Sequence, residues 1–388
     1  MNGPRTELLA LTTAKTVANT ALRWIGPFLP TLERAFGTNV GTLTTILAVS
    51  EMGGLSTLVT GRVLDRGHRR RIFLAGSAAV AVASVIALGG SVRWFALATV
   101  VLLLGVTNLT VAGLAWVSAR VPYEGRGRAI GIFELSWALA LCIGGPIIAV
   151  LIDSFGWRGP FVGLAVAATA TTIGVLVLVP ADEVTPPPLR PTGGVRVSGR
   201  TADRRSGLPR SAWPPLLASA LTAAAGLAVF VISGAWLSDQ FGVSTAGLGL
   251  VVTGFGLLEL VASGSSAAFS DRLGKRRSVA GGIVVLAVGL VVTASAGTSL
   301  LVAVIGLTVF LTGFEFAFVT SLSLVSEAAP AARGRALGVG NSIGTITRAG
   351  GVYLSGQLYE SVGFGGSLAL SAVVAVVAFA MVLLSRTG

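Results

Sequence analysis

Seven charged side chains interrupt long apolar runs, where an isolated charge is unfavourable and therefore indicates a function. Three are basic and four are acidic, so at least one carboxylate has no base of its own. A buried carboxylate without a base takes up a proton more readily than an exposed one. The set therefore predicts buried ion pairs and at least one proton-binding acid. Its members are Lys15, Arg23, Glu51, Glu134, Glu259, Glu315 and Arg348.

Depth along the apolar runs suggests how these residues pair. Glu51 precedes Gly61, where the run ends, by ten residues, which is roughly 15 Å of helix. Arg348 follows Arg335 by thirteen residues, or roughly 20 Å. The two side chains therefore lie at similar depths near the middle of the membrane, where they can form an ion pair if their helices are neighbours.

The other acids are assigned by the same reasoning. Glu134 and Glu259 lie at similar depths, and Lys15 is available to neutralise Glu134. Glu315 has no base assigned to it and is the best single candidate for binding and releasing a proton. Glu259, Glu134 and Glu51 are the further candidates for proton coupling, with the alternative that each forms a structural pair.

Long helices must position these residues. Hydrophobic residues make up 53% of the chain and charged residues 11%, with a mean hydropathy of +0.85. Each of the apolar runs given below is long enough to cross a bilayer core of about 30 Å as a helix. In lipid, a helix satisfies every backbone hydrogen bond within its own segment. We predict an all-α membrane protein with twelve transmembrane helices, at residues 7–30, 41–60, 72–90, 93–118, 128–152, 160–180, 213–238, 245–268, 278–296, 299–325, 335–358 and 364–385.

An internal repeat divides the chain. The segment GRVLDRGHRRR at 61–71 is echoed by AAFSDRLGKRR at 267–277, an offset of 206 residues. GRAIG at 127–131 matches GRALG at 334–338, an offset of 207. A duplicated, helix-rich membrane chain is typical of secondary transporters.

The repeat predicts two pseudo-symmetric six-helix bundles, residues 1–180 and 213–388. Between them, residues 181–212 are rich in proline, glycine and arginine and predict a basic cytoplasmic linker that rests near anionic lipid headgroups.

The segment 61–71 resembles the loop signature between the second and third helices of the major facilitator superfamily, and 267–277 occupies the equivalent loop of the second half. GWRGPF at 156–161 also resembles a segment common in that superfamily. The resemblance covers essentially the whole chain. In that fold helices two and eleven face each other, as do five and eight, so a Glu51–Arg348 pair would join the two halves. The fold itself names no substrate.

The resemblance also implies a gate. Asp65 would accept hydrogen bonds from the N-terminus of the eleventh helix, where the helix dipole favours an anion, and would hold the cytoplasmic side shut. Arg66 and Arg69 would pair locally or with lipid. Asp271 and Arg272 hold the matching positions in the second copy. We predict that these five residues act in gating.

Candidate substrate contacts follow from residue chemistry. Arg23 and Arg348 present forked guanidinium groups that suit a carboxylate or phosphate. Trp137, with Trp24 nearby, offers an aromatic surface for an amphipathic substrate. Asn108 corresponds to Glu315 at the 207-residue offset, so the two halves present a polar pair at one depth.

Three functional classes remain. The buried acids favour a proton-coupled exporter of small amphipathic molecules. The two arginines favour a proton-coupled or exchange carrier of organic anions or metabolites, as does the absence of a buried arginine from LGVTNLT at 104–110, where many drug exporters of the superfamily carry one. A membrane sensor or lipid translocator is the third class. The chain has one histidine and one cysteine and no phosphate loop, metal cluster or catalytic triad, so we predict no enzyme activity, cofactor or metal.

The basic residues indicate orientation. The net charge is +12, but 22 of the 28 Lys and Arg residues fall in the segments on one side of the predicted helices, and three fall in the loops on the other side. This is the positive-inside rule, which places both termini in the cytoplasm. We therefore expect a monomer in the cell inner membrane whose partners are a small-molecule substrate, protons and lipids, with no role for nucleic acid.

Overall fold

The computed structural model describes residues 4–64, 66–182, 208–328 and 333–385, and every regular element among them is a helix. Nine α-helices precede the linker region and are called the first group. They are α1 (Pro4–Arg23), α2 (Leu29–Phe36), α3 (Val40–Glu51), α4 (Thr57–Leu64), α5 (Arg69–Ala87), α6 (Val92–Arg120), α7 (Tyr123–Cys142), α8 (Gly144–Phe155) and α9 (Arg158–Leu178), with a short 3₁₀ helix, η1 (Met52–Ser56), between α3 and α4.

The helices that follow the linker region are called the second group. They are the 3₁₀ turn η2 (Arg210–Ala212), α10 (Trp213–Phe241), α11 (Thr245–Leu273), α12 (Lys275–Ala294), α13 (Leu300–Glu327), α14 (Arg333–Val362) and α15 (Phe364–Leu384). In the first group α5 packs on α6 and α9, and in the second α12 packs on α13 while α10 packs on α14 and α15.

Ten helical segments within the described residues are long and apolar enough to cross a membrane. Each overlaps one of the predicted spans. The other two predicted spans, 7–30 and 335–358, fall on α1 and α14. These two helices carry Lys15, Arg23 and Arg348, so their polar content reflects the charged contacts they make between neighbouring helices.

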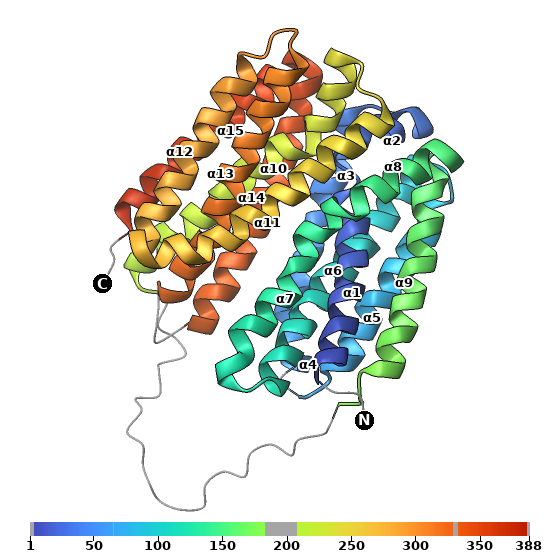
Figure 1. The fold of residues 1–388 in the computed structure, drawn as a ribbon, viewed down its shortest axis with the longest axis vertical. Coiled ribbons are helices and arrows are strands. Elements are labelled where there is room, and N and C mark those ends of the chain that lie inside the picture. The colour runs from blue at the N-terminus through green and yellow to red at the C-terminus, as the bar shows by residue number, and fades with distance from the viewer. Residues whose placement is uncertain (1–3, 65, 183–207, 329–332, 386–388) are drawn as a thin grey trace, which may run out of the picture.

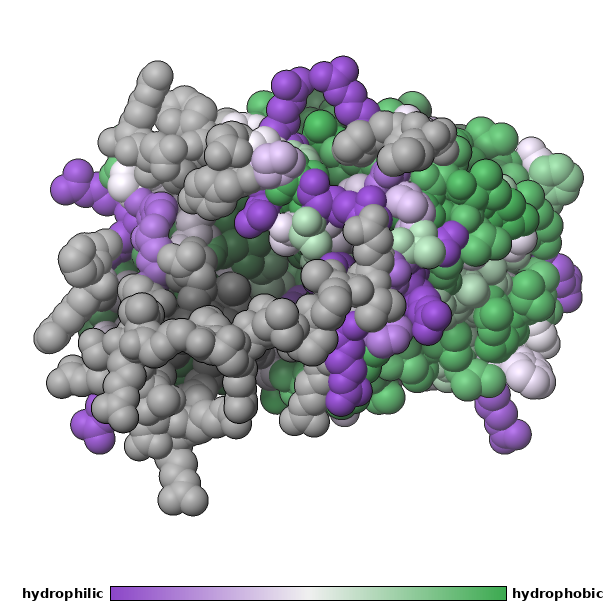
Figure 2. All heavy atoms as spheres, turned by 90° about the horizontal axis from the view of Figure 1, so that it is seen from below, coloured by the Kyte–Doolittle hydropathy of each residue, from purple (hydrophilic) through white to green (hydrophobic). Residues whose placement is uncertain are grey.

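The two groups lie side by side and approach each other most closely at the end opposite the termini, called here the far end (Figure 1). Across this seam α3 packs on α14, and α11 packs on α7 and α8. Both ends of the chain lie at the other end, called here the terminal end. Seen from the terminal end, the molecule is hollowed between the groups, and apolar atoms are visible in the hollow (Figure 2).

Glycines make the close approach at the far end feasible. A Cβ at Gly26 would lie 3.0 Å from the Cα of Val231, and one at Gly234 would overlap the backbone of Pro27. The seam is therefore tight at the far end.

Three predicted helices are interrupted. The first predicted span, 7–30, ends as a helix at Arg23 and turns through Gly26-Pro27 before α2, since proline lacks an N–H group and restricts the residue before it. The second is broken by η1, directly after Glu51. The fifth breaks at Ile143, next to Gly144-Gly145-Pro146. A Cβ at Gly144 would overlap Thr20, and one at Gly145 would lie 2.7 Å from Val252 Cγ1, so this motif serves close packing.

Candidate transport site

A buried ion pair joins the two groups at Arg23 and Glu259. Arg23 ends α1, and its two terminal nitrogens donate hydrogen bonds of 2.7 Å and 2.5 Å to the two carboxylate oxygens of Glu259 on α11. The residues are 6% and 3% exposed. A paired fork geometry of this kind is the arrangement in which guanidinium and carboxylate compensate each other's loss of water.

The surroundings of Arg23 hold its guanidinium in place. Nη1 also donates a 2.8 Å hydrogen bond to the backbone carbonyl of Trp137. The guanidinium carbon lies 4.1 Å from the centre of the Trp137 ring and 5.4 Å from that of Phe230, both within cation–π range. Trp137, predicted as a substrate contact, therefore serves as a platform for Arg23, which ties α1 to α7, α10 and α11.

A second ion pair crosses the seam between Glu51 and Arg348, as predicted from their depths and from the family resemblance. Arg348 Nε donates a 3.1 Å hydrogen bond to Glu51 Oε2. Both side chains are partly buried, at 22% and 17% exposure for Arg348 and Glu51. The 3₁₀ helix η1 starts at the next residue after Glu51, and short 3₁₀ stretches within longer helices often mark hinges.

The third ion pair, Lys15 with Glu134, lies within the first group and was also predicted. Lys15 Nζ is 2.8 Å from Glu134 Oε1 and 4.2 Å from the centre of the Phe133 ring. Lys15 is 2% exposed, whereas the Glu134 side chain is 46% exposed. A half-exposed carboxylate is unfavourable in lipid, so its exposed side must face water.

Glu315 differs from the other three acids. It lies on α13 and is 3% exposed. Its Oε1 accepts a 2.9 Å hydrogen bond from the hydroxyl of Ser263, while its Oε2 has no hydrogen-bond partner within the described part of the chain. Glu259 and Arg23 lie within electrostatic range of its carboxyl group. No described basic side chain forms an ion pair with it, which agrees with the excess of acids over bases in the sequence.

Glu134 and Glu259, which the sequence placed at similar depths, are each paired with a base. The acid that lies near Glu259 is Glu315. Arg23 and Arg348 are not free to receive an anion in this conformation, since both engage glutamates.

Asn108 forms hydrogen bonds within the first group. Its Nδ2 donates hydrogen bonds to Ser56 Oγ at 2.9 Å and to the backbone carbonyl of Leu104 at 2.7 Å, and its Oδ1 accepts from Thr60. These contacts fasten α6 to η1 and α4. None of these hydrogen bonds involves Glu315, so the placement of the two residues at one depth stays a prediction.

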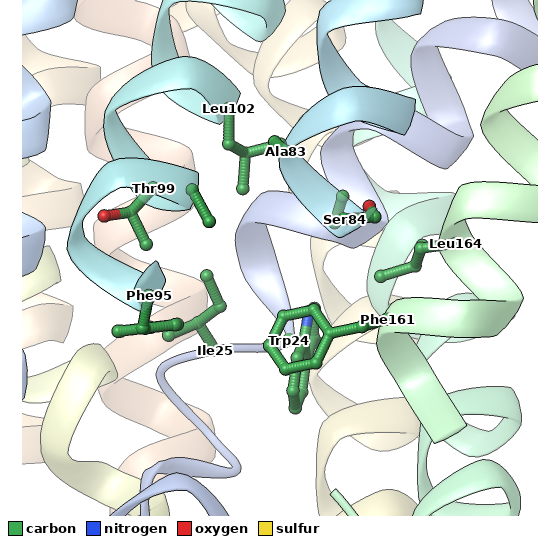
Figure 3. A pocket seen from close by; sticks show the side chains of 11 residues that line it. Trp24, Ile25, Ala83, Ser84, Phe95, Thr99, Leu102, Phe161 and Leu164 are labelled. Carbon is green, nitrogen blue, oxygen red and sulfur yellow. The ribbon is translucent and has the colours of Figure 1, made fainter. Parts of the chain in front are cut away.

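Trp24 packs inside the first group. It is 1% exposed, and its ring lies 5.2 Å from that of Phe161 in an edge-on arrangement. It lines a small apolar pocket between α1, α5, α6 and α9, with a volume of about 10 Å³ (Figure 3). That volume is about the minimum for one water molecule, so the pocket is a packing gap and no substrate site.

The predicted gating residues are only partly described. Asp65 lies outside the described residues, as do the side chains of Asp271 and Arg272, whose backbone belongs to α11. Arg66 is exposed in the loop before α5, and Arg69 begins α5. The structure therefore leaves the predicted gate untested.

Each repeated segment contains one arginine that binds the end of another helix, a role that the sequence did not reveal. Arg70 donates a 2.5 Å hydrogen bond to the carbonyl of Leu176, near the end of α9. Arg276 donates a 3.0 Å hydrogen bond to the carbonyl of Val382, near the end of α15. Donor and acceptor are each displaced by 206 residues, the offset of the repeat. A basic side chain at a helix C-terminus satisfies free carbonyls and complements the dipole.

Membrane-spanning helices in two groups, with charges paired across the seam between them, define a membrane transporter built from a duplicated unit. The chain matches the Major Facilitator Superfamily over residues 11–234 and 216–388, and it belongs to that family. It is therefore an integral membrane protein and a secondary transporter, and not an enzyme.

Similar proteins include an uncharacterised MFS-type transporter of Mycobacterium tuberculosis, MT3072, which is 26% identical over 89% of this chain and 77% of its own length. The chloramphenicol resistance protein of Streptomyces lividans is 26% identical over 68% of this chain and 67% of its own. A solved bacterial homologue of the lysosomal transporter Spinster, in an inward-facing and unoccupied conformation, superposes with a TM-score of 0.73 at 14% identity, covering 99% of this chain and 95% of that one.

Proposed function

We propose that this chain is a proton-coupled exporter of small amphipathic molecules that works by alternating access in the cell inner membrane. The observation that carries the proposal is Glu315. It is buried, one of its oxygens has no partner among the described residues, and the other three membrane-embedded acids are paired. A lone buried carboxylate is suited to bind a proton in one conformation and release it in another.

Glu259 connects this proton site to the conformational change. Glu315 lies within electrostatic range of Glu259, and Glu259 holds Arg23 across the seam. When Glu315 is neutral, Arg23 is fully available to Glu259 and the seam is held together. When Glu315 is ionised, it repels Glu259 and competes for Arg23. Loss of the proton therefore weakens the contact between the groups.

The proposed architecture is a pair of six-helix halves, residues 1–180 and 213–388, joined by the linker 181–212. Twelve spans result if α1 and α14 are counted with the ten more apolar segments. The excess of Lys and Arg at the terminal end supports a cytoplasmic location for both termini. In that orientation this conformation is closed to the outside and open to the cytoplasm, ready to load a cytoplasmic substrate.

Export is favoured by the half-exposed carboxylate of Glu134 and by the similarity to a chloramphenicol resistance protein. The alternative, a carrier of organic anions, is favoured by the fork of Arg23, where a substrate carboxylate would replace that of Glu259. The two classes differ in the charge that the site accepts, so a substrate panel separates them.

The test uses purified protein in liposomes with an imposed pH gradient. The panel contains neutral and cationic amphipathic compounds, including chloramphenicol, and small organic acids. The proposal predicts accumulation of an amphipathic compound in the compartment from which protons flow out, and loss of accumulation when a protonophore collapses the gradient. Transport of organic acids alone would establish the anion carrier instead. A transport rate that does not depend on the pH gradient would contradict proton coupling.

A further inference from the structure

At the far end, the last turns of α14 lie directly against the start of α3. The backbone N–H of Gly41, the second residue of α3, donates a 3.1 Å hydrogen bond to Oε1 of Glu360. Nε2 of Gln357 donates to the carbonyl of Gly41 at 3.2 Å and to Oγ1 of Thr45 at 3.3 Å. Two side chains of the second group thus hold both polar backbone groups of one glycine in the first.

The contact depends on very close packing of the two helices. A Cβ at Gly356 on α14 would overlap the side chain of Thr44, which is fully buried. A Cβ at Gly41 would lie 3.0 Å from Cγ of Glu360, tighter than most real contacts. Gly356 therefore has no room for a side chain, and a side chain at Gly41 would have to displace that of Glu360.

Charge supports the same arrangement. The first N–H groups of a helix have no partner within the helix and carry partial positive charge. In α3, Asn39 accepts from the N–H of Thr42, and Glu360 accepts from that of Gly41. The helix is thus capped partly by its own chain and partly by a carboxylate from the other group. The second part of the cap is lost whenever the groups separate at this end.

We propose that Gln357 and Glu360 form a far-end latch, which holds the two groups together at the end opposite the termini and must release before the transport site opens there. The two residues act by position and do not touch substrate. Both are exposed to water, so each hydrogen bond is individually weak and the latch can open within a transport cycle. The sequence predicts a similar carboxylate contact at the other end of the same helix pair, at Asp65, but the far-end latch does not depend on it.

The experiment measures the separation of the groups at the far end. Spin labels are placed at Ser154, near the end of α8, and at Thr298, between α12 and α13, both exposed and outside the latch. The background is Cys142→Ser, which removes the single native cysteine. Pulsed electron resonance then gives the distribution of distances in lipid nanodiscs. The parent is expected to show a short-distance population that corresponds to the closed far end.

The variant Gln357→Ala with Glu360→Ala removes the three hydrogen bonds. It is expected to raise the ratio of long to short distances about tenfold, since each solvent-exposed bond contributes only a small factor. Glu360→Gln keeps an acceptor and loses the charge, so it should fall between the parent and the double variant. Gly356→Ala should open the far end without altering either latch residue.

The matched control is Gly350→Ala, on the same helix, where a Cβ meets nothing within 4 Å. It should reproduce the parent distribution. The latch is wrong if the double alanine variant gives the same distribution as the parent and as Gly350→Ala. If the double variant does not fold, Glu360→Gln tests the latch instead. A distribution of spin-label distances unchanged from the parent would then exclude a role for the charge of Glu360.

Discussion

Arg23 and Glu259 bind each other through two parallel hydrogen bonds, although one residue ends the first long helix and the other lies 236 positions later on α11. The pair is buried and spans the two helix groups. It can exist only while α1 and α11 are adjacent at this level. It therefore belongs to the conformation described here, and its rupture is part of any opening at the far end.

Glu259→Gln tests how strongly this pair stabilises the protein. Removing one partner of a buried ion pair leaves the other charge unpaired and typically costs about 3–5 kcal/mol. We expect a clearly lower midpoint of thermal unfolding in detergent. The double variant Arg23→Gln with Glu259→Gln leaves no charge behind and should recover part of the loss. A single variant as stable as the parent would show that the pair contributes little.

Glu51 and Arg348 are expected to act as a unit in transport. Glu51→Gln and Arg348→Gln should each impair transport, and the double variant should lose less than the sum. Contacting charged residues give coupling energies of about 0.5–3 kcal/mol in such cycles. Transport rates of the four proteins in liposomes provide the measurement. Strict additivity would mean that the 3.1 Å contact has no energetic role.

Glu33 on α2 predicts a pH dependence at the far end. Burial raises the pKa of this carboxyl group, Asp239 on α10 and Glu360 on α14 raise it further, and Arg34 opposes them. Tyr359 donates a 2.6 Å hydrogen bond to Asp239. Separation of the groups removes the two acids and lowers the pKa of Glu33. The closed far end therefore binds a proton more readily than the open one.

Acidic pH therefore stabilises the closed far end. The closed form gains stability at pH values below the pKa that Glu33 has in the open form, and this gain is lost as the pH rises through the higher pKa of the closed form. In the Glu315→Gln background, which removes the other proton site, acidic medium should shorten the distance between labels at Ser154 and Thr298. Glu33→Gln should abolish this shift, whereas Asp153→Asn, at an exposed acid elsewhere on the far end, should preserve it.

Asp65 remains a prediction from the sequence. If its carboxylate caps the start of α14 and closes the terminal end, Asp65→Asn should favour the form that is open at that end without unfolding the protein. The change in population follows because the contact exists in only one of the two states. Labelling of single cysteines by membrane-impermeant reagents from the cytoplasmic side is the measurement. Equal labelling in variant and parent would exclude the contact.

The sequence predicted an all-helical membrane protein because long apolar runs give the helices. A constant rise per residue gave the depths of Glu51 and Arg348, and the family resemblance made their helices neighbours. Lys15 was assigned to Glu134 as a base available to neutralise it. These arguments need no knowledge of where a helix bends.

The Arg23–Glu259 pair was missed because the first helix was expected to continue to residue 30. It ends at Arg23, and the chain turns through Gly26-Pro27 before α2. Gly26-Pro27 was a visible signal for this break. The hydrogen bonds of Arg70 and Arg276 to helix ends were missed for another reason. The matching acceptors are backbone carbonyls, which leave no mark in the sequence beyond the offset of 206 residues.

Glu315→Gln tests the central claim most directly. The amide mimics a carboxyl group that is permanently protonated, so it can complete the site but cannot release a proton. The account predicts that this variant loses transport driven by a pH gradient while substrate exchange without a gradient continues, and that Asp153→Asn behaves as the parent in both assays. Gradient-driven transport by Glu315→Gln with the pH dependence of the parent would contradict the account and place the proton site elsewhere.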